Sequence, residues 1–422
     1  MAGSTTQTVN VNGRDYRWPE APLVVICCDG SEPAYMELAL EAGLMPNLNR
    51  IMAKGENLRG FSAMPSFTNP NNLSIVTGRP PSWHGICGNY LIDPESGEEV
   101  MMNDPKWLRA PTIFEGFQRA GASVAVITAK DKLRLLLGKG LIFDGTAVCF
   151  SSEKADAANL AENGIADVCP LVGMMVPPVY SAELSEFVLA AGVKLLEGIR
   201  PQITYLSTTD YIQHMFAPGS KGANDFYRML DRYLGALDRS GAIIVLTADH
   251  GMKDKHLANG APDVIYLQDR LDELFGSGRT RVILPITDPY VVHHGALGSY
   301  ATVYLRGAPA DEAAAAVRRM EGIDLVLERS EAARLFELPE DRTGDLVVIS
   351  GGPQASKVIG TSRGRHDLSA LKEPLRSHGG LTEQEIPIIT NRKAAGLSGV
   401  LRNFDAFAIG CNHLAALAEA AE

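Results

Sequence analysis

The sequence lacks the features that would tie a chain of 422 residues to a membrane or to a nucleic acid. Its first residues, Met-Ala-Gly-Ser-Thr-Thr-Gln-Thr, have neither the basic start nor the apolar centre of a secretory signal peptide. No apolar run approaches the roughly 20 residues of a membrane-spanning helix. Lysine and arginine number 39 against 50 aspartates and glutamates, and the net charge of −11 would repel nucleic acid and anionic lipid. We therefore expect a cytoplasmic protein with neither a membrane nor a nucleic acid as its partner, and the oligomeric state stays open, a homodimer included.

Cysteine is also scarce, and its placement excludes a disulfide framework or a cysteine-rich metal site. The six cysteines contain no CxxC pair, and Cys27 and Cys28 are neighbours inside an apolar stretch. Thiols in such a stretch are usually small core residues. A reducing compartment fits this pattern.

The apolar residues that are present form short runs that alternate with helical periods. The hydrophobic fraction of 45% and the charged fraction of 21% are ordinary for a globular protein. Alternation of buried strands with helices predicts an α/β fold with a mostly parallel sheet flanked by helices. The predicted strands are 23–28, 123–128, 203–208, 242–246 and 386–390. The stretch 36–54 is helical in period, and Pro46 suits the first turn of a second helix within it. The other predicted helices are 113–120, 154–162, 182–198, 224–239 and 405–420, and a hairpin is expected near 12–13.

The pattern of apolar residues changes after Gly251. Short β-rich runs and helical stretches follow in the order β–α–β–α–β between residues 300 and 349, with apolar positions of their own. A segment with its own core predicts a separate unit. We expect an inserted α+β cap at 253–370, and a catalytic core formed by 1–252 and 371–422.

The chain is organised around Asp249-His250-Gly251, which ends the most apolar of these runs. Ligand sites of open α/β sheets form beyond the carboxyl ends of the strands. Asp29 follows strand 23–28 in the same way, and Asp210 follows strand 203–208. His214 lies four residues after Asp210, which places both side chains on one face of a helix.

Thr68 stands in an unusual stretch, Pro65-Ser-Phe-Thr-Asn-Pro70, just before helical residues 72–77. A hydroxyl there would lie at a helix N-terminus, where backbone N–H groups and the helix dipole favour an anion. Alternatively, Thr68 merely caps the helix. The stretch by itself leaves both interpretations open.

Three carboxylates and three imidazoles could divide into two sets of three metal ligands. The candidates are Asp29, Asp210, Asp249, His214, His250 and His378. Mixed oxygen and nitrogen ligation suits zinc best, with manganese or iron as alternatives. Two such ions, roughly 4 Å apart, can clamp the attacking and leaving groups of a displacement at phosphorus. A threonine hydroxyl beside one ion becomes nucleophilic at neutral pH.

These motifs occur as an ordered series, D-G, P-x-x-T-x-P, D-x-x-x-H, A-D-H-G and S-H-G-G. The series covers nearly the whole chain outside the cap. It resembles the alkaline phosphatase superfamily, particularly the nucleotide pyrophosphatase/phosphodiesterase branch. One departure is Gln213, because many nucleotide-cleaving relatives have glycine before the histidine of D-x-x-x-H.

The resemblance implies an alkaline-phosphatase-like core and a role for each matching residue. One zinc would be surrounded by Asp29, Thr68, Asp249 and His250. The other would be held by Asp210, His214 and His378. Thr68 would be the nucleophile, and Asn89 would donate a hydrogen bond to a phosphoryl oxygen in the transition state.

Lys130 and Lys132 follow strand 123–128 at the same edge of the predicted sheet. Lysines beyond a strand are usually solvated, but this is the edge at which ligands bind. Within the superfamily, the chain is most similar to enzymes that hydrolyse the carbon–phosphorus bond of phosphonoacetate. This resemblance implies that the two lysines clamp the substrate carboxylate, with Thr68, Asn89 and His214 also at the substrate. A phosphothreonine intermediate would lead to acetate and phosphate.

Two other functions fit the same residues. A nucleotide phosphodiesterase or pyrophosphatase would share the metals and the nucleophile but would need a base-stacking pocket. A metal-bound sensor without activity is the second alternative, and an intact Thr68 with a full ligand set argues against it.

Overall fold

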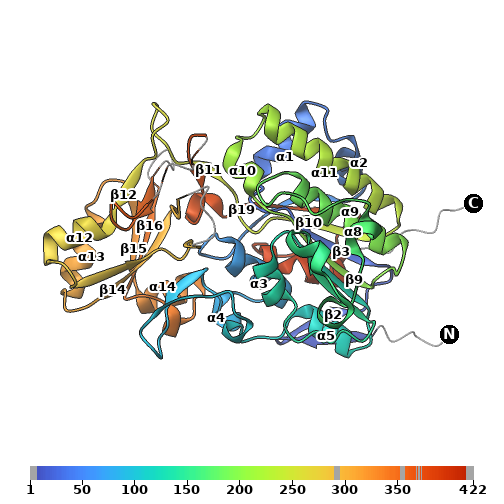
Figure 1. Cartoon of the computed structure of the whole chain (residues 1–422), viewed down its shortest axis with the longest axis horizontal. Helices are drawn as coiled ribbons and strands as arrows, with labels where there is room; N and C mark the ends of the chain where they lie inside the picture. The colour runs from blue at the N-terminus through green and yellow to red at the C-terminus, as the bar shows by residue number, and fades with distance from the viewer. Residues whose placement is uncertain are drawn as a thin grey trace, which may run out of the picture.

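The structure, a computed structural model, describes residues 7–288, 295–351, 357–366, 368, 371 and 373–414. Figure 1 shows two lobes, with a seven-stranded sheet and its helices on the right and a four-stranded sheet on the left. No helix among the described residues has the length and the apolar character that crossing a membrane requires.

The larger sheet has the strand order β4-β19-β10-β3-β9-β7-β8. Its strands are β3 (Leu23–Cys27), β4 (Glu56–Phe61), β7 (Val124–Thr128), β8 (Ala147–Ser151), β9 (Ile203–Ser207), β10 (Ile243–Thr247) and β19 (Glu385–Thr390). The strands from β10 to β8 run parallel, whereas β19 is antiparallel to both β10 and β4. The predicted α/β fold with a mostly parallel sheet is therefore confirmed.

Alternate residues of the central strand β3 face two separate apolar layers. Val24 and Ile26 belong to one cluster, while Val25 and Cys27 belong to the other. The first layer includes the helices α1 (Pro33–Glu41), α2 (Pro46–Lys54), α9 (Glu183–Glu197) and α11 (Lys221–Arg239). The second includes α3 (Thr68–Thr77), α5 (Ile113–Arg119) and α6 (Asp131–Leu137). Burial on both faces explains why β3 is apolar throughout, and the neighbours Cys27 and Cys28 are both core residues, as predicted.

The smaller sheet lies within the segment expected to be a cap. It has the strand order β13-β14-β16-β15, and all its pairs are antiparallel. Its elements are α12 (Leu267–Phe275), β13 (Thr280–Ile283), β14 (Tyr300–Leu305), α13 (Ala310–Arg318), β15 (Ile323–Glu328), α14 (Arg329–Phe336) and β16 (Leu346–Ser350). Its apolar core also takes in Met64 and Phe67, which precede Thr68 in the sequence. The smaller sheet therefore packs against the segment that carries the predicted nucleophile.

The remaining elements are short. They are β1 (Thr8–Val11), β2 (Arg14–Arg17), α4 (Pro81–His84), β5 (Tyr90–Ile92), β6 (Glu99–Met101), α7 (Leu160–Asn163), α8 (Val168–Val172), α10 (Tyr211–Met215), β11 (Lys253–Asp254), β12 (Val264–Tyr266), β17 (Val358–Gly360), β18 (Arg376–Ser377) and α15 (Ala406–Ala408), with 3-10 turns at Pro105–Trp107, Ser152–Ala157, Glu340–Arg342, Leu381–Glu383 and Asn403–Asp405 and a π-turn at Ile409–His413. The predicted hairpin is present, and Asn12 and Gly13 adopt φ of 53° and 73° at its turn.

Two predicted helices are wrong in extent. In place of one helix at 154–162, the chain forms the 3-10 turn Ser152–Ala157 and the separate short helix α7, because Lys154 leaves helical geometry (φ −127°, ψ 30°) and Asn159 caps a new start. At the C-terminus the helical turns end at His413, and Leu414 is extended and pairs with Ala394. The remainder of the predicted helix 405–420 lies outside the described residues.

Candidate active site

Three neighbouring parallel strands deliver acidic side chains to one edge of the larger sheet. Asp249 follows β10, Asp29 follows β3 and Asp210 follows β9, and these strands are adjacent in the order β10-β3-β9. Since carboxyl ends of parallel strands share an edge, the chain brings the three carboxylates together although 181 residues separate Asp29 from Asp210. All three side chains are buried.

Two groups of side chains at this edge have the composition of metal sites. Asp210, His214 and His378 form one group, and Asp29, Asp210 and His250 form the other. Within each group the ligand atoms lie within 4.8 Å of one another. Asp210 belongs to both groups, whereas the sequence-based division placed it in only one.

Each of the three histidines directs its Nε2 atom toward a carboxylate and its Nδ1 atom toward a backbone oxygen. The Nδ1 atom of His214 lies 2.7 Å from the backbone oxygen of Arg376. The Nδ1 atom of His378 lies 2.8 Å from that of Ser66, and the Nδ1 atom of His250 lies 2.9 Å from that of Gly251. A carbonyl oxygen only accepts, so each Nδ1 carries a proton, and a ring without a second proton would present an Nε2 lone pair. This is the usual arrangement of a metal-binding histidine.

The contacts between these nitrogens and the carboxylates require positive charge between them. Asp210 Oδ2 lies 2.9 Å from His214 Nε2 and 3.6 Å from His378 Nε2. Asp29 Oδ1 lies 3.4 Å from His250 Nε2 and is buried without a hydrogen-bond partner among the described residues. Two acceptors at such distances repel unless a proton or a metal cation lies between them. The donor set therefore fits divalent cations.

Burial shifts the protonation of this cluster. It raises the pKa of the Asp29 carboxyl well above its ordinary value, and the charges of Asp210 and Asp249 raise it further. Burial likewise lowers the pKa of His378, with the neighbouring His250 and His214 adding to the effect. The rings of His250 and His378 are stacked, with centroids 3.7 Å apart. Bound cations would relieve this crowding of carboxylates and imidazoles.

Asp249 belongs to neither of the two groups of potential metal ligands. Its Oδ1 accepts from the backbone N–H groups of Gly30 and His250, at 3.2 Å and 3.0 Å. Its Oδ2 lies 3.6 Å from His250 Nε2 and accepts from Asn72 Nδ2 at 3.2 Å. The carboxylate is thus held in one orientation beside His250.

Thr68 is the first residue of α3, and its hydroxyl does not cap the helix. Phe67 is the N-cap residue, in extended geometry and without a side-chain cap bond. Thr68 Oγ1 instead lies 3.2 Å from His250 Nε2. Because that nitrogen carries the lone pair in the neutral ring, the hydroxyl donates to it. The structure therefore argues against the capping interpretation, and the role of Thr68 as the nucleophile stays a prediction.

A cavity of about 500 Å³ opens beside Thr68. The predicted site residues that line it are Asp29, Thr68, Asn89, Lys130, Lys132, Asp210, His214 and His378. Asn89 Nδ2 donates to the backbone oxygen of Ile286 at 3.2 Å, and an amide nitrogen has a second hydrogen to offer. Asp249 and His250 do not line the cavity.

The two lysines occupy the same cavity as Thr68 and have contacts of their own. Lys130 Nζ lies 3.5 Å from the backbone oxygen of Val179 and 5.4 Å from the centre of the Tyr180 ring. Burial lowers the pKa of Lys130 despite the nearby acidic groups. Lys132 Nζ pairs with both oxygens of Asp288, at 2.8 Å and 3.0 Å. Neither lysine is a simple solvated side chain.

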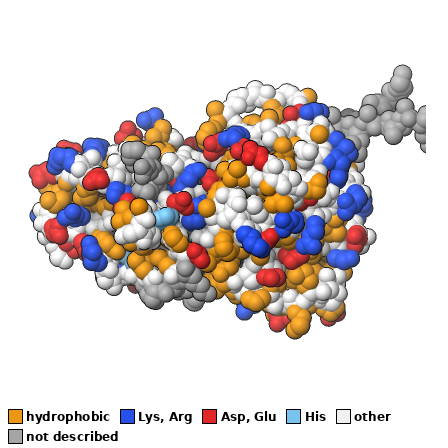
Figure 2. All heavy atoms as spheres, turned by 90° about the horizontal axis from the view of Figure 1, so that it is seen from above, with side chains coloured by type: hydrophobic (Ala, Val, Ile, Leu, Met, Phe, Trp, Pro, Cys, Tyr) orange, Lys and Arg blue, Asp and Glu red, His pale blue; other side chains and the backbone are white. Residues whose placement is uncertain are grey.

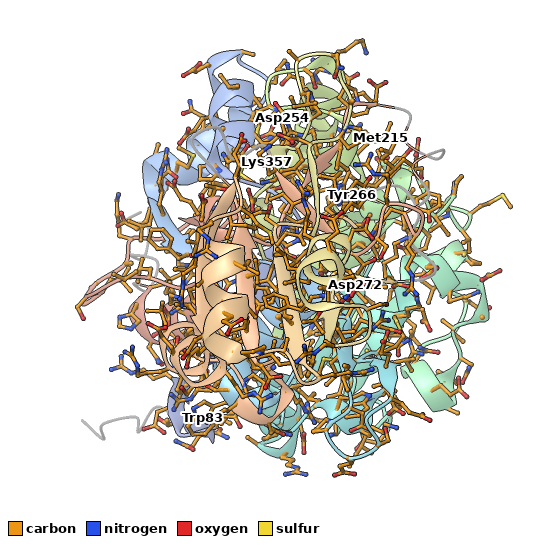
Figure 3. All side chains as sticks on the ribbon, turned by 90° about the vertical axis from the view of Figure 1, so that its left-hand side faces the viewer. Trp83, Met215, Asp254, Tyr266, Asp272 and Lys357 are labelled. Carbon is orange, nitrogen blue, oxygen red and sulfur yellow. The ribbon has the colours of Figure 1, made fainter. Side chains whose placement is uncertain are left out.

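Sequence reasoning missed several residues at this site. Asp288 and Tyr180 line the cavity, and the buried Asn72 bonds the Asp249 carboxylate, but none of them belongs to the series of site motifs. Gln213 is buried and directs its amide nitrogen to Tyr227 OH at 3.1 Å, so the residue that departs from the family pattern does not line the cavity. Sequence proximity to the site is also a poor guide. Trp83 is 49% exposed, and Figure 3 places it at the opposite edge from Met215, the residue after His214.

His84 is buried under the segment that leads to Asn89. Its Nε2 lies 2.9 Å from Ser74 Oγ, and its Nδ1 accepts from the backbone N–H of Ile86 at 3.2 Å. Burial, together with the charge of Arg342, lowers the pKa of His84 from 6.5 to about 3. The folded protein therefore holds this ring neutral.

The lowered pKa of His84 predicts loss of stability in acid. Above pH 6.5 the His84 ring is neutral in both the folded and the unfolded protein. Between pH 6.5 and about pH 3 the ring binds a proton only in the unfolded protein, which favours unfolding. From pH 7 to pH 5 this residue should reduce the free energy of unfolding by about 2 kcal/mol. Denaturant titrations at the two pH values would measure the loss. His84→Gln should show a difference between them that is smaller by that amount; an unchanged difference would contradict the assignment.

Comparison with known proteins identifies the class. The chain matches the family of type I phosphodiesterases and nucleotide pyrophosphatases over residues 23–358. The protein therefore belongs to this family, the branch of the alkaline phosphatase superfamily that its motifs resemble.

One solved relative with high similarity is a phosphonoacetate hydrolase. The chain is 62% identical to that enzyme from Sinorhizobium meliloti, with a TM-score of 0.93 over 96% of this chain and 99% of the other. That enzyme has been solved in complex with phosphonoformate and with phosphonoacetate. The resemblance predicted from the motifs is thereby confirmed.

More distant relatives carry less information about function. An uncharacterized pyrophosphatase/phosphodiesterase of Schizosaccharomyces pombe is 32% identical over 55% of this chain and 45% of its own length. The chain spans less than half the length of the first curated relatives it matches. Murine ectonucleotide pyrophosphatase/phosphodiesterase 5 is 17% identical with a TM-score of 0.63 over 92% of this chain and 94% of the other, which shows a shared fold.

Proposed function

We propose that the protein hydrolyses the carbon–phosphorus bond of phosphonoacetate to acetate and phosphate. The observation that carries the proposal is one cavity that is lined by Thr68, by four members of the acidic and histidine cluster and by Lys130 and Lys132. The phosphonate group of the substrate would bind at the cluster, and its carboxylate would bind the two lysines. The 62% identity to a phosphonoacetate hydrolase supports the same substrate.

The local positive charge matters because the protein as a whole is acidic. The net charge is −11, and Figure 2 shows acidic and basic side chains intermingled over one face, without a block of either sign. The overall field would not attract an anion carrying both a phosphonate and a carboxylate. Binding must then depend on charge placed inside the cavity, from the lysines and from metal ions.

We further propose that two zinc ions bind here, with manganese or iron as alternatives. Asp29, Thr68, Asp249 and His250 would surround one ion, and Asp210, His214 and His378 would hold the other. The carboxylate of Asp210 also lies in a group with Asp29 and His250, so it would contribute to the first ion as well. Oxygen and neutral imidazole ligands suit these metals. When bound, the ions supply positive charge that lowers the pKa of the threonine hydroxyl and neutralises phosphoryl oxygens.

The reaction would proceed in two displacements. The hydroxyl proton of Thr68 passes to water as Oγ1 forms a bond to phosphorus. The electron pair of the breaking carbon–phosphorus bond moves into the carboxylate, giving an enediolate. Lys130 and Lys132 stabilise that charge while a proton from water completes acetate. Asn89 donates to a phosphoryl oxygen as the charge there increases. Water then cleaves the phosphothreonine, which releases phosphate and restores the hydroxyl.

The inserted segment 253–370 would act as a cap on the core formed by 1–252 and 371–422. Ile286 and Asp288 come from this segment, and both line the cavity beside core residues. A cap that contributes to the wall can exclude water from the reacting groups.

A phosphate-release screen with zinc-loaded protein tests the function. Phosphonoacetate should be the best substrate, ahead of methylphosphonate, which lacks the carboxylate, and ahead of aryl and nucleotide esters, which lack the phosphonate carbon. The metal content of the same preparation should be measured in parallel. Cleavage of nucleotide diesters without any release of phosphate from phosphonoacetate would instead identify a nucleotide phosphodiesterase.

The lysines should determine preference for a carboxylate. Lys130→Ala and Lys132→Ala should each reduce kcat/KM for phosphonoacetate by about 10²- to 10³-fold, because a buried charge pair is left incomplete. Turnover of an aryl phosphodiester should change much less. Lys194→Ala, an exposed lysine of α9, serves as the control and should leave both activities intact. Equal losses on the two substrates would contradict the proposed clamp.

A further inference from the structure

Asn72 lies wholly buried in α3, between the predicted nucleophile and a carboxylate of the cluster. Its Nδ2 donates to the backbone oxygen of Thr68 at 3.1 Å and to Asp249 Oδ2 at 3.2 Å. One amide group thus joins the first turn of the nucleophile's helix to the side chain that follows β10. None of the sequence motifs includes this residue.

The orientation of the Asn72 amide is determined from its other end. Its Oδ1 accepts from Tyr205 OH at 2.7 Å and from Ser207 Oγ at 2.9 Å. Both hydroxyls are buried, and they lie two residues apart on β9, hence on the same face of the sheet. A flipped amide would turn its oxygen toward the Thr68 carbonyl and the Asp249 carboxylate, which are both acceptors. All four hydrogen-bonding positions of the side chain are therefore used in one orientation only.

The bond to Asn72 completes the restraint on Asp249. Backbone N–H groups hold Oδ1, and Asn72 holds Oδ2. A carboxylate oxygen that accepts one hydrogen bond still has a second lone pair for a cation. Partners that orient a ligand in this way typically change metal affinity or activity by about 10- to 100-fold.

We infer that Asn72 is a positioning residue, which sets Asp249 and Thr68 at a fixed separation and holds Asp249 in the orientation that a metal ion requires. Tyr205 and Ser207 act through it by fixing the amide. The inference rests on the proposed metal-dependent function and deepens it. It assigns to β9 a second contribution to the site besides Asp210, made through side chains that do not line the cavity.

Zinc affinity tests the inference without any substrate. Competition between the full-length protein and a chromophoric chelator, with zinc alone as the probe, should show one of two sites weakened by about 10- to 100-fold in Asn72→Ala. The matched control is Asn71→Ala. Asn71 is equally buried in the same helix, but its Nδ2 donates to the backbone oxygens of Ala63, Pro65 and Phe67. Its Oδ1 accepts from the backbone N–H of Ala63 and from Asn403 Nδ2, so neither end of the amide bonds the Asp249 carboxylate. The control should unfold more easily yet bind zinc as the wild type does. Unchanged zinc affinity in Asn72→Ala, or equal losses in both variants, would overturn the inference.

Tyr205→Phe provides a milder variant should Asn72→Ala fail to fold. It removes only a hydroxyl that bonds the Asn72 oxygen, so the weakened amide orientation should reduce zinc affinity by about 3- to 10-fold. In the Asn72→Ala background the same change should add nothing further. Wild-type zinc affinity in Tyr205→Phe would overturn the inference while leaving the proposed function intact. A wild-type protein that binds no zinc would overturn both.

Discussion

Thr68→Ala should abolish phosphate release from phosphonoacetate, with turnover reduced by on the order of 10⁴- to 10⁶-fold, as expected for loss of a covalent nucleophile. The hydroxyl lines the cavity and lies 3.2 Å from His250 Nε2, at the edge where the acidic side chains converge. No other hydroxyl needs to be invoked for the first displacement. Zinc-loaded protein and a phosphate assay with long incubation would measure the residual rate.

Two comparisons separate chemistry from folding in this experiment. Thr68→Ser keeps a hydroxyl and should retain measurable activity. Thr77→Ala removes a buried hydroxyl at the other end of α3, which bonds only backbone oxygens, and should retain nearly all of it. Rapid acid quenching of the wild type during turnover should trap a phosphoryl group on Thr68, detectable by mass spectrometry. A Thr68→Ala variant within tenfold of the wild type would rule out the covalent step.

The strands and the residues that end them could be predicted from local sequence. A strand buried on both faces should be largely apolar. β3 is apolar throughout, and β10 is apolar up to its last residue, Thr247. The first polar side chains after such strands, Asp29 and Asp249, then stand at the sheet edge. The same logic placed Asp210 beyond β9. These inferences need only short windows of sequence because the parallel sheet supplies the long-range order.

Other contacts at the site depend on tertiary structure and left no local signal. Lys132 and Asp288 are 156 residues apart, and Asn72 and Tyr205 are 133 apart. An isolated asparagine or aspartate in a loop or helix has many possible partners, and only packing selects one. The shared position of Asp210 is of the same kind, since it depends on how far α10 and the His378 segment approach each other.

Asp210 offers the second large effect, because its carboxylate belongs to both ligand groups. Asp210→Ala should bind neither zinc ion tightly and should lose on the order of 10³-fold or more in turnover. His214→Ala removes a ligand of one group only and should retain one equivalent of zinc. Elemental analysis after dialysis would give the stoichiometry of each variant beside its phosphate-release rate.

The matched control for Asp210→Ala is Asp231→Ala, which removes a buried carboxylate of α11. Asp231 accepts from Asn47 and from the backbone N–H of Leu48, and none of these three residues lines the cavity. This control should be less stable than the wild type but should hold the same zinc content. Wild-type zinc content in Asp210→Ala would contradict the shared position of its carboxylate.

Thermal unfolding gives an independent measure of the same coupling. A cation that binds only the folded state, present at about 1,000 times its Kd, adds about 4 kcal/mol to the free energy of unfolding. Chelation should therefore lower the Tm of the wild type, where the cation separates carboxylates and imidazole nitrogens that otherwise face one another as acceptors. Asp210→Ala lacks the shared ligand, so its Tm should barely respond to chelator or to added zinc. A large zinc-dependent shift in that variant would mean that the remaining ligands hold both cations without Asp210.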